Sequence, residues 1–162
     1  MSSTKVIKTL KSFDDLKIKN LKPSVDVLII NKITSLKGSE NLPKTLKFIQ
    51  IGTMNGSVKL SSWDGVEGFP ESLEEIHIMH SKLTSLPDKP LKHLVNLKNL
   101  SLVENNIDNF KGISNIPDNL ELLNLQHNPL STWDEMEKNS VKKIDISNTF
   151  LGIIGQPRPD IQ

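Results

Sequence analysis

One pattern of Leu, Ile and Asn recurs along the chain and constrains its fold more than any other feature. In residues 97–110 the pattern occupies Leu97, Leu100, Leu102, Asn105, Ile107 and Phe110. It returns 23 positions later at Leu120, Leu123, Leu125, Asn128, Leu130 and Trp133. A unit of this length cannot bury its apolar side chains alone and must stack on neighbouring units. The pattern therefore predicts a solenoid.

Three units share a second spacing, in which an apolar residue is followed by Pro and then by three apolar residues at steps of 7, 3, 3 and 2 positions. The sets are Leu36, Pro43, Leu46, Ile49 and Ile51; Trp63, Pro70, Leu73, Ile76 and Ile78; and Phe110, Pro117, Leu120, Leu123 and Leu125. Because Pro fixes φ and lacks an amide donor, it suits a connector that enters a strand. We predict strands near residues 46–51, 73–78, 97–102, 120–125 and 141–146.

The first repeat and both ends of the chain depart from the pattern. Residues 25–30 are apolar on both faces, which favours a strand covered on both sides. Residues 3–22 carry Val6, Leu10 and Phe13 at helical spacing and are expected to form that cover. The apolar run 150–154 is expected to fold over the other end, and an insertion at 53–57 forms a Gly-containing loop. The expected division is an N-terminal capping segment at 1–24, repeats at 25–154 and a C-terminal tail at 155–162.

Across residues 25–154 these motifs resemble the leucine-rich repeat family. Residues 33–38 and 107–113 are similar to the short subclass typified by phosphatase-1 regulators, the spliceosomal A-prime protein and bacterial internalins. The Pro positions are similar to those of bacterial ubiquitin-ligase effectors. Met54, Ser81 and Thr149 replace the Asn in three units, and the chain has no Tyr for the family's C-terminal capping motif.

The resemblance implies an α/β solenoid of about six repeats in a horseshoe arc. A parallel β-sheet would line the concave face, and 3-10 or irregular segments would form the convex face. An Asn after each strand would be buried and would stabilise the following turn. The family mostly binds proteins.

Composition narrows the class of function. The absence of Cys excludes disulfides, zinc knuckles and thiol catalysis. A net charge of +1 and a single Arg, Arg158, weaken a nucleic-acid interpretation. No apolar stretch suits a signal peptide or a membrane span, so we expect a cytoplasmic protein, or one inside a host cell if it is an effector. Residues 1–60 hold eleven Lys against four acidic residues; this is either a solvated surface or a polarity that orients a partner.

Strand alternation predicts which side chains face the concave surface. Phe48, Met79, Val103 and Leu122 are apolar at such positions on four adjacent strands, and an exposed apolar stripe usually marks a contact site. Single exposed apolar residues are common, so an ordinary surface is the alternative. The expected partner-binding residues are Phe48, Gln50, Glu75, His77, Met79, Ser101, Val103, Leu122, Asn124 and Gln126.

Two further sets of residues have structural interpretations. His80, Glu104 and His127 hold the same position of successive repeats and should line one rim. A weak zinc or copper site is possible there, but ligands on non-adjacent strands lie about 10 Å apart, so a solvated rim is favoured and no metal is expected. Trp63 and Trp133 should each pack in the convex core, with the indole N–H donated to a carbonyl.

Catalysis has little support, because the chain contains no phosphate loop, nucleophile elbow or His-Glu-x-x-His motif. The first hypothesis is a non-enzymatic module that binds a protein partner through the concave face, without a cofactor, small-molecule substrate, nucleic acid or membrane. The second is an adaptor or effector fragment that works with a separate catalytic chain, as a regulatory subunit. The third, less favoured, is metal or nucleic-acid binding.

Overall fold

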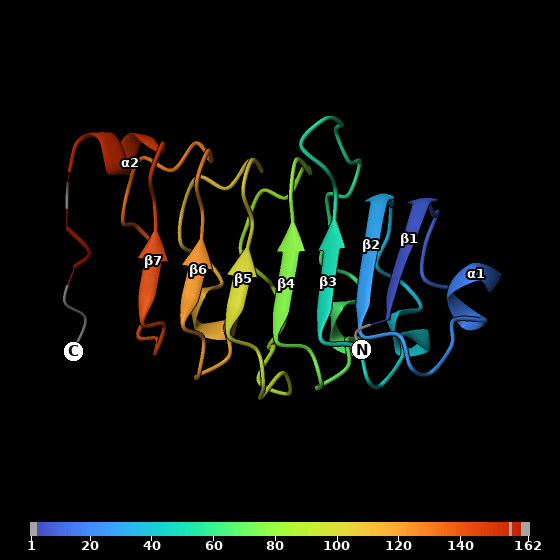
Figure 1. Cartoon of the computed structure of the whole chain (residues 1–162). Coiled ribbons are helices and arrows are strands. Elements are labelled where there is room, and N and C mark those ends of the chain that lie inside the picture. The colour runs from blue at the N-terminus through green and yellow to red at the C-terminus, as the bar shows by residue number, and fades with distance from the viewer. Residues whose placement is uncertain (1–2, 156, 160–162) are drawn as a thin grey trace.

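The structure is a computed structural model and describes residues 3–155 and 157–159. In this part of the chain, seven parallel strands lie side by side in one sheet and follow one another in chain order (Figure 1). They are β1 (Thr4–Thr9), β2 (Val27–Lys32), β3 (Phe48–Ile51), β4 (Glu75–Ile78), β5 (Asn99–Ser101), β6 (Leu122–Asn124) and β7 (Lys143–Asp145). The five strands predicted from the spacing are confirmed, and the chain is a parallel solenoid.

The core consists of columns of identical repeat positions. In β3, Ile49 and Ile51 are fully buried, whereas Phe48 and Gln50 are only half-buried. Ile49 is in register with Ile76 of β4, and Ile51 with Ile78. Burying one such side chain stabilises the fold by about 1.5–3 kcal/mol. The columns continue through Leu28, Ile30, Leu100 and Leu123, so each repeat completes the core of its neighbours.

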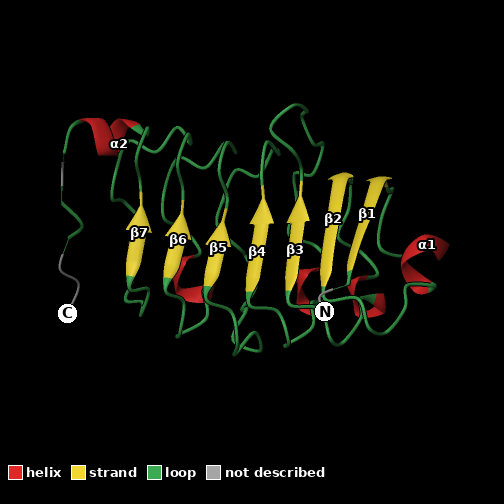
Figure 2. Ribbon diagram, in the orientation of Figure 1, coloured by secondary structure: helices red, strands yellow, loops and turns green. Residues whose placement is uncertain are grey.

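Short 3-10 helices form the side of the solenoid opposite the strands (Figure 2). They are η1 (Ser39–Asn41), η2 (Val66–Gly68) and η3 (Ile113–Asn115), and each follows a Gly with positive φ. At Gly112, φ is 95° and a Cβ would lie 2.5 Å from the carbonyl oxygen of Pro87 in the preceding repeat. Gly is required here because other residues disfavour positive φ and because the two repeats touch at this point.

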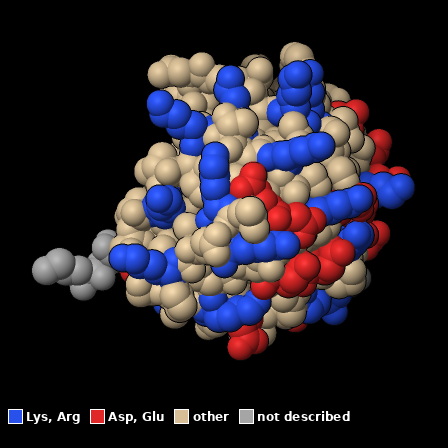
Figure 3. Space-filling model, turned by 90° about the vertical axis from the view of Figure 1, so that its right-hand side faces the viewer, with Lys and Arg blue, Asp and Glu red and all other residues tan. Residues whose placement is uncertain are grey.

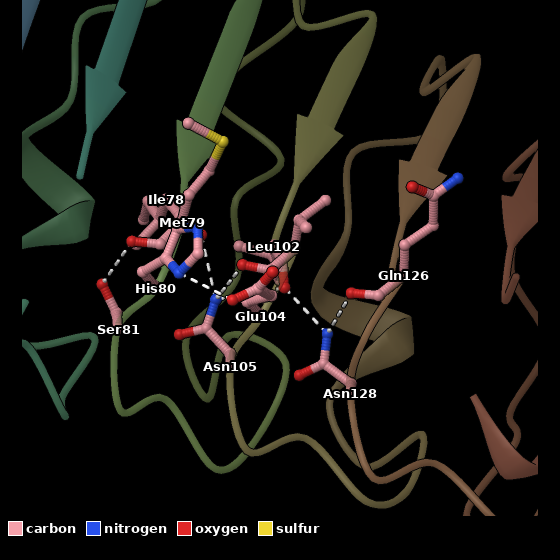
Figure 4. Close-up of polar contacts among 10 residues, drawn as sticks. Ile78, Met79, His80, Ser81, Leu102, Glu104, Asn105, Gln126 and Asn128 are labelled. Carbon is pink, nitrogen blue, oxygen red and sulfur yellow. Dashed lines mark hydrogen bonds and ion pairs between the residues drawn. The ribbon is translucent and has the colours of Figure 1, made fainter. Parts of the chain in front are cut away.

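Buried Asn side chains connect consecutive repeats (Figure 4). Nδ2 of Asn105 donates to the carbonyl oxygens of Ile78 at 2.9 Å and Leu102 at 3.1 Å, and its Oδ1 accepts from the amide of Leu83 at 3.2 Å. Asn128 repeats this arrangement one unit later, donating to Leu102 at 2.8 Å and accepting from Ile107 at 3.0 Å. Both Asn residues are buried. The predicted role of these Asn side chains is confirmed.

The N-terminal segment begins with a strand, so the helix predicted there from the spacing of apolar residues is wrong. β1 pairs in parallel with β2, from Thr4 opposite Val27 to Thr9 opposite Lys32. Val6 is 55% exposed, so it does not share a buried face with Leu10 and Phe13. The following helix, α1 (Leu16–Lys19), is a single turn.

A degenerate repeat explains this difference. Leu10 and Phe13 precede Ile33 and Leu36 by 23 positions, the same offset that relates β1 to β2. All four side chains are buried at corresponding places in the core. The repeat was not apparent in the sequence because its strand carries Lys5 where β2 carries Leu28.

Residues 25–30 are also not covered on both faces. Val25, Leu28 and Ile30 are buried at the repeat spacing, whereas Val27 and Ile29 are half-buried on the solvent side of the sheet. Asp26 does not point into the core, because its Oδ1 accepts the amide of Ser3 at 2.6 Å. The uniform apolarity of this segment therefore reflects an apolar patch on the solvent side.

At the other end, α2 (Phe150–Ile153) covers the last repeat with one side chain. Leu151 is buried, whereas Phe150, Ile153 and Ile154 are more than half exposed. Thr149 occupies the Asn position and caps α2, with Oγ1 accepting the amide of Gly152 at 3.0 Å. Of the expected tail at 155–162, residues 156 and 160–162 lie outside the described residues. Within the described part, no helix is long and apolar enough to cross a membrane.

The two Trp residues differ in their hydrogen bonding. Trp63 is buried and its Nε1 donates to the carbonyl oxygen of Ser85 in the next repeat at 3.0 Å, as predicted. Trp133 stacks on Phe110 with ring centroids 4.9 Å apart, but its buried Nε1 has no partner in the described part of the chain. Trp133 packs against the core as predicted, but the predicted hydrogen bond from its indole to a carbonyl is wrong for the described residues.

Replacing Asn105 with Leu should lower the free energy of unfolding by about 1–3 kcal/mol, because the amide of Leu83 and the carbonyl of Ile78 lose a buried partner. Urea denaturation measures this change. Asn106→Leu is the matched control, since Asn106 is exposed on the same turn. Equal stabilities of the two variants would contradict the assigned role of Asn105.

Replacing Gly112 with Ala should destabilise the protein by more than the same change at Gly155. Both glycines have positive φ, but only Gly112 has the backbone of a neighbouring repeat where the methyl group would lie. The left-handed conformation alone costs about 1–2 kcal/mol, and the clash at Gly112 adds to it. Thermal or urea unfolding of both variants gives the comparison. A loss at Gly112 no greater than at Gly155 would show that the two repeats do not touch there.

Candidate functional site

The solvent-facing side chains of the strands form one surface, which we call the sheet face. The parallel register arranges them in rows that run across the strands. The first row contains Thr4, Val27, Phe48, Glu75, Asn99, Leu122 and Lys143. The second row contains Val6, Ile29, Gln50, His77, Ser101, Asn124 and Asp145. A third row, just beyond the strand ends, contains Gly52, Met79, Val103, Gln126 and Ser147. Every residue expected to bind a partner therefore lies on the sheet face.

The four apolar side chains of the predicted stripe are divided between two rows. Phe48 and Leu122 belong to the first row, where Glu75 and Asn99 separate them. Met79 and Val103 follow neighbouring strands in the third row. The stripe is not continuous, because all strands pair without a stagger and the residues are at different positions within their repeats.

An aromatic and acidic cluster occupies the sheet face between β3 and β4. The rings of Phe48 and His77 are 5.0 Å apart at an interplanar angle of 40°. Nε2 of His77 lies 2.9 Å from Oε2 of Glu75, and the His77 side chain is 26% exposed. The three side chains hold one another in place while each keeps an accessible surface.

Polar groups dominate the C-terminal half of the sheet face. Nε2 of Gln126 donates to Oδ2 of Asp145 at 2.9 Å, and the hydroxyl of Ser147 donates to Oδ1 of Asp145 at 2.7 Å. Burial raises the pKa of Asp145, but the hydrogen bonds from Ser147 and Gln126 outweigh it and hold this pKa below the usual value. Asp145 is therefore an ionised carboxylate at neutral pH.

The predicted rim is present, with a backbone conformation that the sequence did not indicate. His80, Glu104 and His127 all have positive φ, at 52°, 55° and 58°. Nδ1 of His80 lies 2.7 Å from Oε2 of Glu104. Within residues 3–155 and 157–159, no group of three or more His, Asp and Glu side chains is placed to hold a metal ion.

Four residues of the sheet face were missed in the sequence: Thr4 and Val6 on β1, and Val27 and Ile29 on β2. Val27 and Ile29 lie beside Phe48 and Gln50 in the register and are half-buried like them. The signal that could have found them is the spacing of Val25, Leu28 and Ile30, which matches the inward positions of the other repeats. With these residues, the apolar part of the sheet face centres on β2 and β3.

The insertion at 53–57 forms a loop that projects beyond the end of β3 (Figure 1). An isolated bridge joins Thr53 and Gly56, and Met54 at the tip is 80% exposed. The chain then rejoins the core at Val58, whose amide donates to the carbonyl of His80 at 2.8 Å. The loop is an accessible neighbour of the sheet face.

Comparisons with known proteins agree with this architecture. The leucine rich repeat family profile matches residues 71–130. Toll-like receptor 8 of Homo sapiens is 32% identical over 99 residues, which cover 55% of this chain and 9% of the receptor. The chain thus spans less than a tenth of the length of the receptor that it matches.

The matched residues include β4 to β6 and both buried Asn side chains. These similarities concern the family and not its short subclass. Repeat spacing, parallel sheet, inter-repeat Asn hydrogen bonds and family match agree: residues 71–130 are leucine-rich repeats, and the same parallel sheet continues on both sides of them.

Proposed function

We propose that this chain is a non-catalytic module that binds a partner protein on its sheet face. Leucine-rich repeat domains are in general protein-interaction modules, and solenoids of this kind use their extended curved surface for binding. The observation that carries the proposal is the chemistry of the sheet face around β2, β3 and β4. Apolar side chains gather there and are bordered by polar ones, as at most protein interfaces.

Phe48 is at the centre of this surface. Val27 lies beside it on β2, Glu75 on β4, and the ring of His77 packs 5.0 Å from its ring. Aromatic side chains of this kind contribute a large share of the binding energy at interfaces. A half-buried ring is partly ordered before the partner arrives, which reduces the entropy lost on binding.

The strands give the sheet face its rigidity. The inward neighbours of Phe48 are Ile49 and, across the strand pair, Ile76, and both are buried in the core. A partner that covers the apolar part and its polar border would bury roughly 800 Å² on each side, the size of a standard interface. Such a surface supports specific binding without a deep pocket.

A working partnership with a separate catalytic chain, as a regulatory subunit or effector fragment, would use the same surface. In this alternative the bound partner is an enzyme. Assaying the captured protein for activity distinguishes this alternative from a simple binding module.

Phe48→Ala and Met79→Glu should each weaken binding to a captured partner by more than tenfold, equivalent to about 1.4 kcal/mol or more. Both side chains lie on the sheet face and neither belongs to the buried core, so the fold should persist. Affinity capture with the wild-type chain, followed by calorimetric titration of the identified partner, measures the effect.

Val95→Glu provides the matched control, because Val95 is 57% exposed and lies outside the strands and the rows of the sheet face. The control should bind as the wild type does. Wild-type affinity in both sheet-face variants would overturn the proposal. Loss of affinity in Val95→Glu alone would also overturn it, because the partner would then bind outside the sheet face.

A further inference from the structure

β1 is the edge strand of the sheet. Among residues 3–155 and 157–159, it pairs with β2 along one side only. The carbonyls of Asp26 and Ile30 point to β3, where they accept the amides of Phe48 at 3.0 Å and Gly52 at 2.9 Å. The backbone N–H and C=O groups of successive residues point to opposite sides of a strand. Those of Val27 and Ile29 therefore point to β1, and those of Lys5 and Ile7 point from β1 to β2. The backbone groups of Thr4 and Val6 therefore point away from the sheet.

These outward groups have no partner in the described part of the chain. No hydrogen bond from residues 3–155 or 157–159 reaches the backbone amide or carbonyl of Thr4 or Val6 on that side. An unpaired strand edge is a template for another extended chain, which adds through main-chain hydrogen bonds.

A cleft of about 830 Å³ runs along this edge, between β1 and the segment that contains α1. Its volume is within the range of ligand-binding clefts. Lys5 and Lys8 line it from β1, and Lys17 and Lys22 line it from the opposite side. Its lining includes Ile7 and Leu21 but no acidic residue. Figure 3 looks onto this end of the molecule, where Lys side chains spread over the face and acidic side chains gather toward one side.

We propose that the outer edge of β1 and this cleft bind an extended acidic peptide segment, which adds a further strand to the sheet. The backbone of the segment pairs with Thr4 and Val6. Its acidic side chains lie against Lys5, Lys17 and Lys22, and the apolar side chains between them lie on the opposite face of the added strand, beside the exposed Val6. The site differs from the sheet face around Phe48, because β2 separates β1 from β3, and the two surfaces meet where Val6 lies beside Ile29.

The charges favour such a peptide over a second copy of this chain. Two β1 strands that paired edge to edge would bring Lys5 and Lys8 of one copy close to those of the other, and like charges across strands are destabilising. A polyanion without amide groups could meet the lysines but could not pair with the strand edge. The unpaired backbone of Thr4 and Val6 therefore favours a peptide over nucleic acid.

A fluorescein-labelled peptide of alternating Glu and Val, about as long as β1, is the probe. Its fluorescence anisotropy should rise on titration with the full chain, and replacing Glu by Gln in the peptide should weaken binding at least about fivefold, because the lysines lose their counter-charges. Two further peptides carry N-methyl groups, one on all Glu amides and one on all Val amides. Since only one set of amides can face β1, at least one of these peptides should lose binding.

The variant Lys17→Gln/Lys22→Gln should also weaken binding of the Glu-Val peptide at least about fivefold. Lys11→Gln/Lys19→Gln is the matched control, because these lysines are exposed nearby in sequence and do not line the cleft. Phe48→Ala should bind the peptide as the wild type does, which separates this site from the one on the sheet face.

Three results would overturn the proposal: no rise in anisotropy, equal binding of both N-methylated peptides and the unmodified one, or equal losses in the two lysine variants. Competition by single-stranded DNA, with a half-maximal concentration as low as that of the unlabelled peptide, would likewise show a general polyanion surface in place of a strand-addition site.

Discussion

The structure depends on one constraint: no repeat can bury its own apolar side chains without the repeats on either side. The columns formed by Ile49, Ile76 and Leu100 satisfy this constraint in the core. Polar contacts follow the same direction, since Asn105 and Asn128 bond to backbone groups of the preceding repeat. The strands therefore follow one another in the sheet in chain order, because each repeat is stabilised by the repeats next to it.

This constraint also determines where binding surfaces occur. Along the middle of the solenoid the inward side chains are committed to the core, so only the sheet face and the projecting loops are free to vary. At the ends the stacking stops. Lys5 stands where other repeats carry Leu or Ile, and Phe150 remains exposed beyond the last strand. The apolar part of the sheet face and the lysine-lined cleft beside β1 are therefore consequences of the same architecture.

The sequence predicted those parts of the fold in which local pattern and stacking agree. Repeats with intact spacing gave the correct strands, and the two intact Asn positions gave the inter-repeat hydrogen bonds. The prediction was wrong at residues 3–22, because Val6, Leu10 and Phe13 match a helical period by coincidence. Lys5 also occupies a position that is apolar in the other strands, so the strand pattern is interrupted. The division of the apolar stripe between two rows could not be predicted from a count of positions alone. It depends on the register between strands, which is a tertiary property.

Residue-level hydrogen exchange of the free chain, followed by NMR, tests the central claim that each repeat is held by its neighbour. The amides of Leu83 and Ile107 lie in turns outside the strands but donate to Asn105 and Asn128, so they should exchange as slowly as the strand amides. The amides of Thr4 and Val6, on the open edge, should exchange much faster than that of Ile7 in the same strand. Rapid exchange at Leu83 and Ile107, or protection at Thr4 and Val6 equal to that at Ile7, would contradict the account.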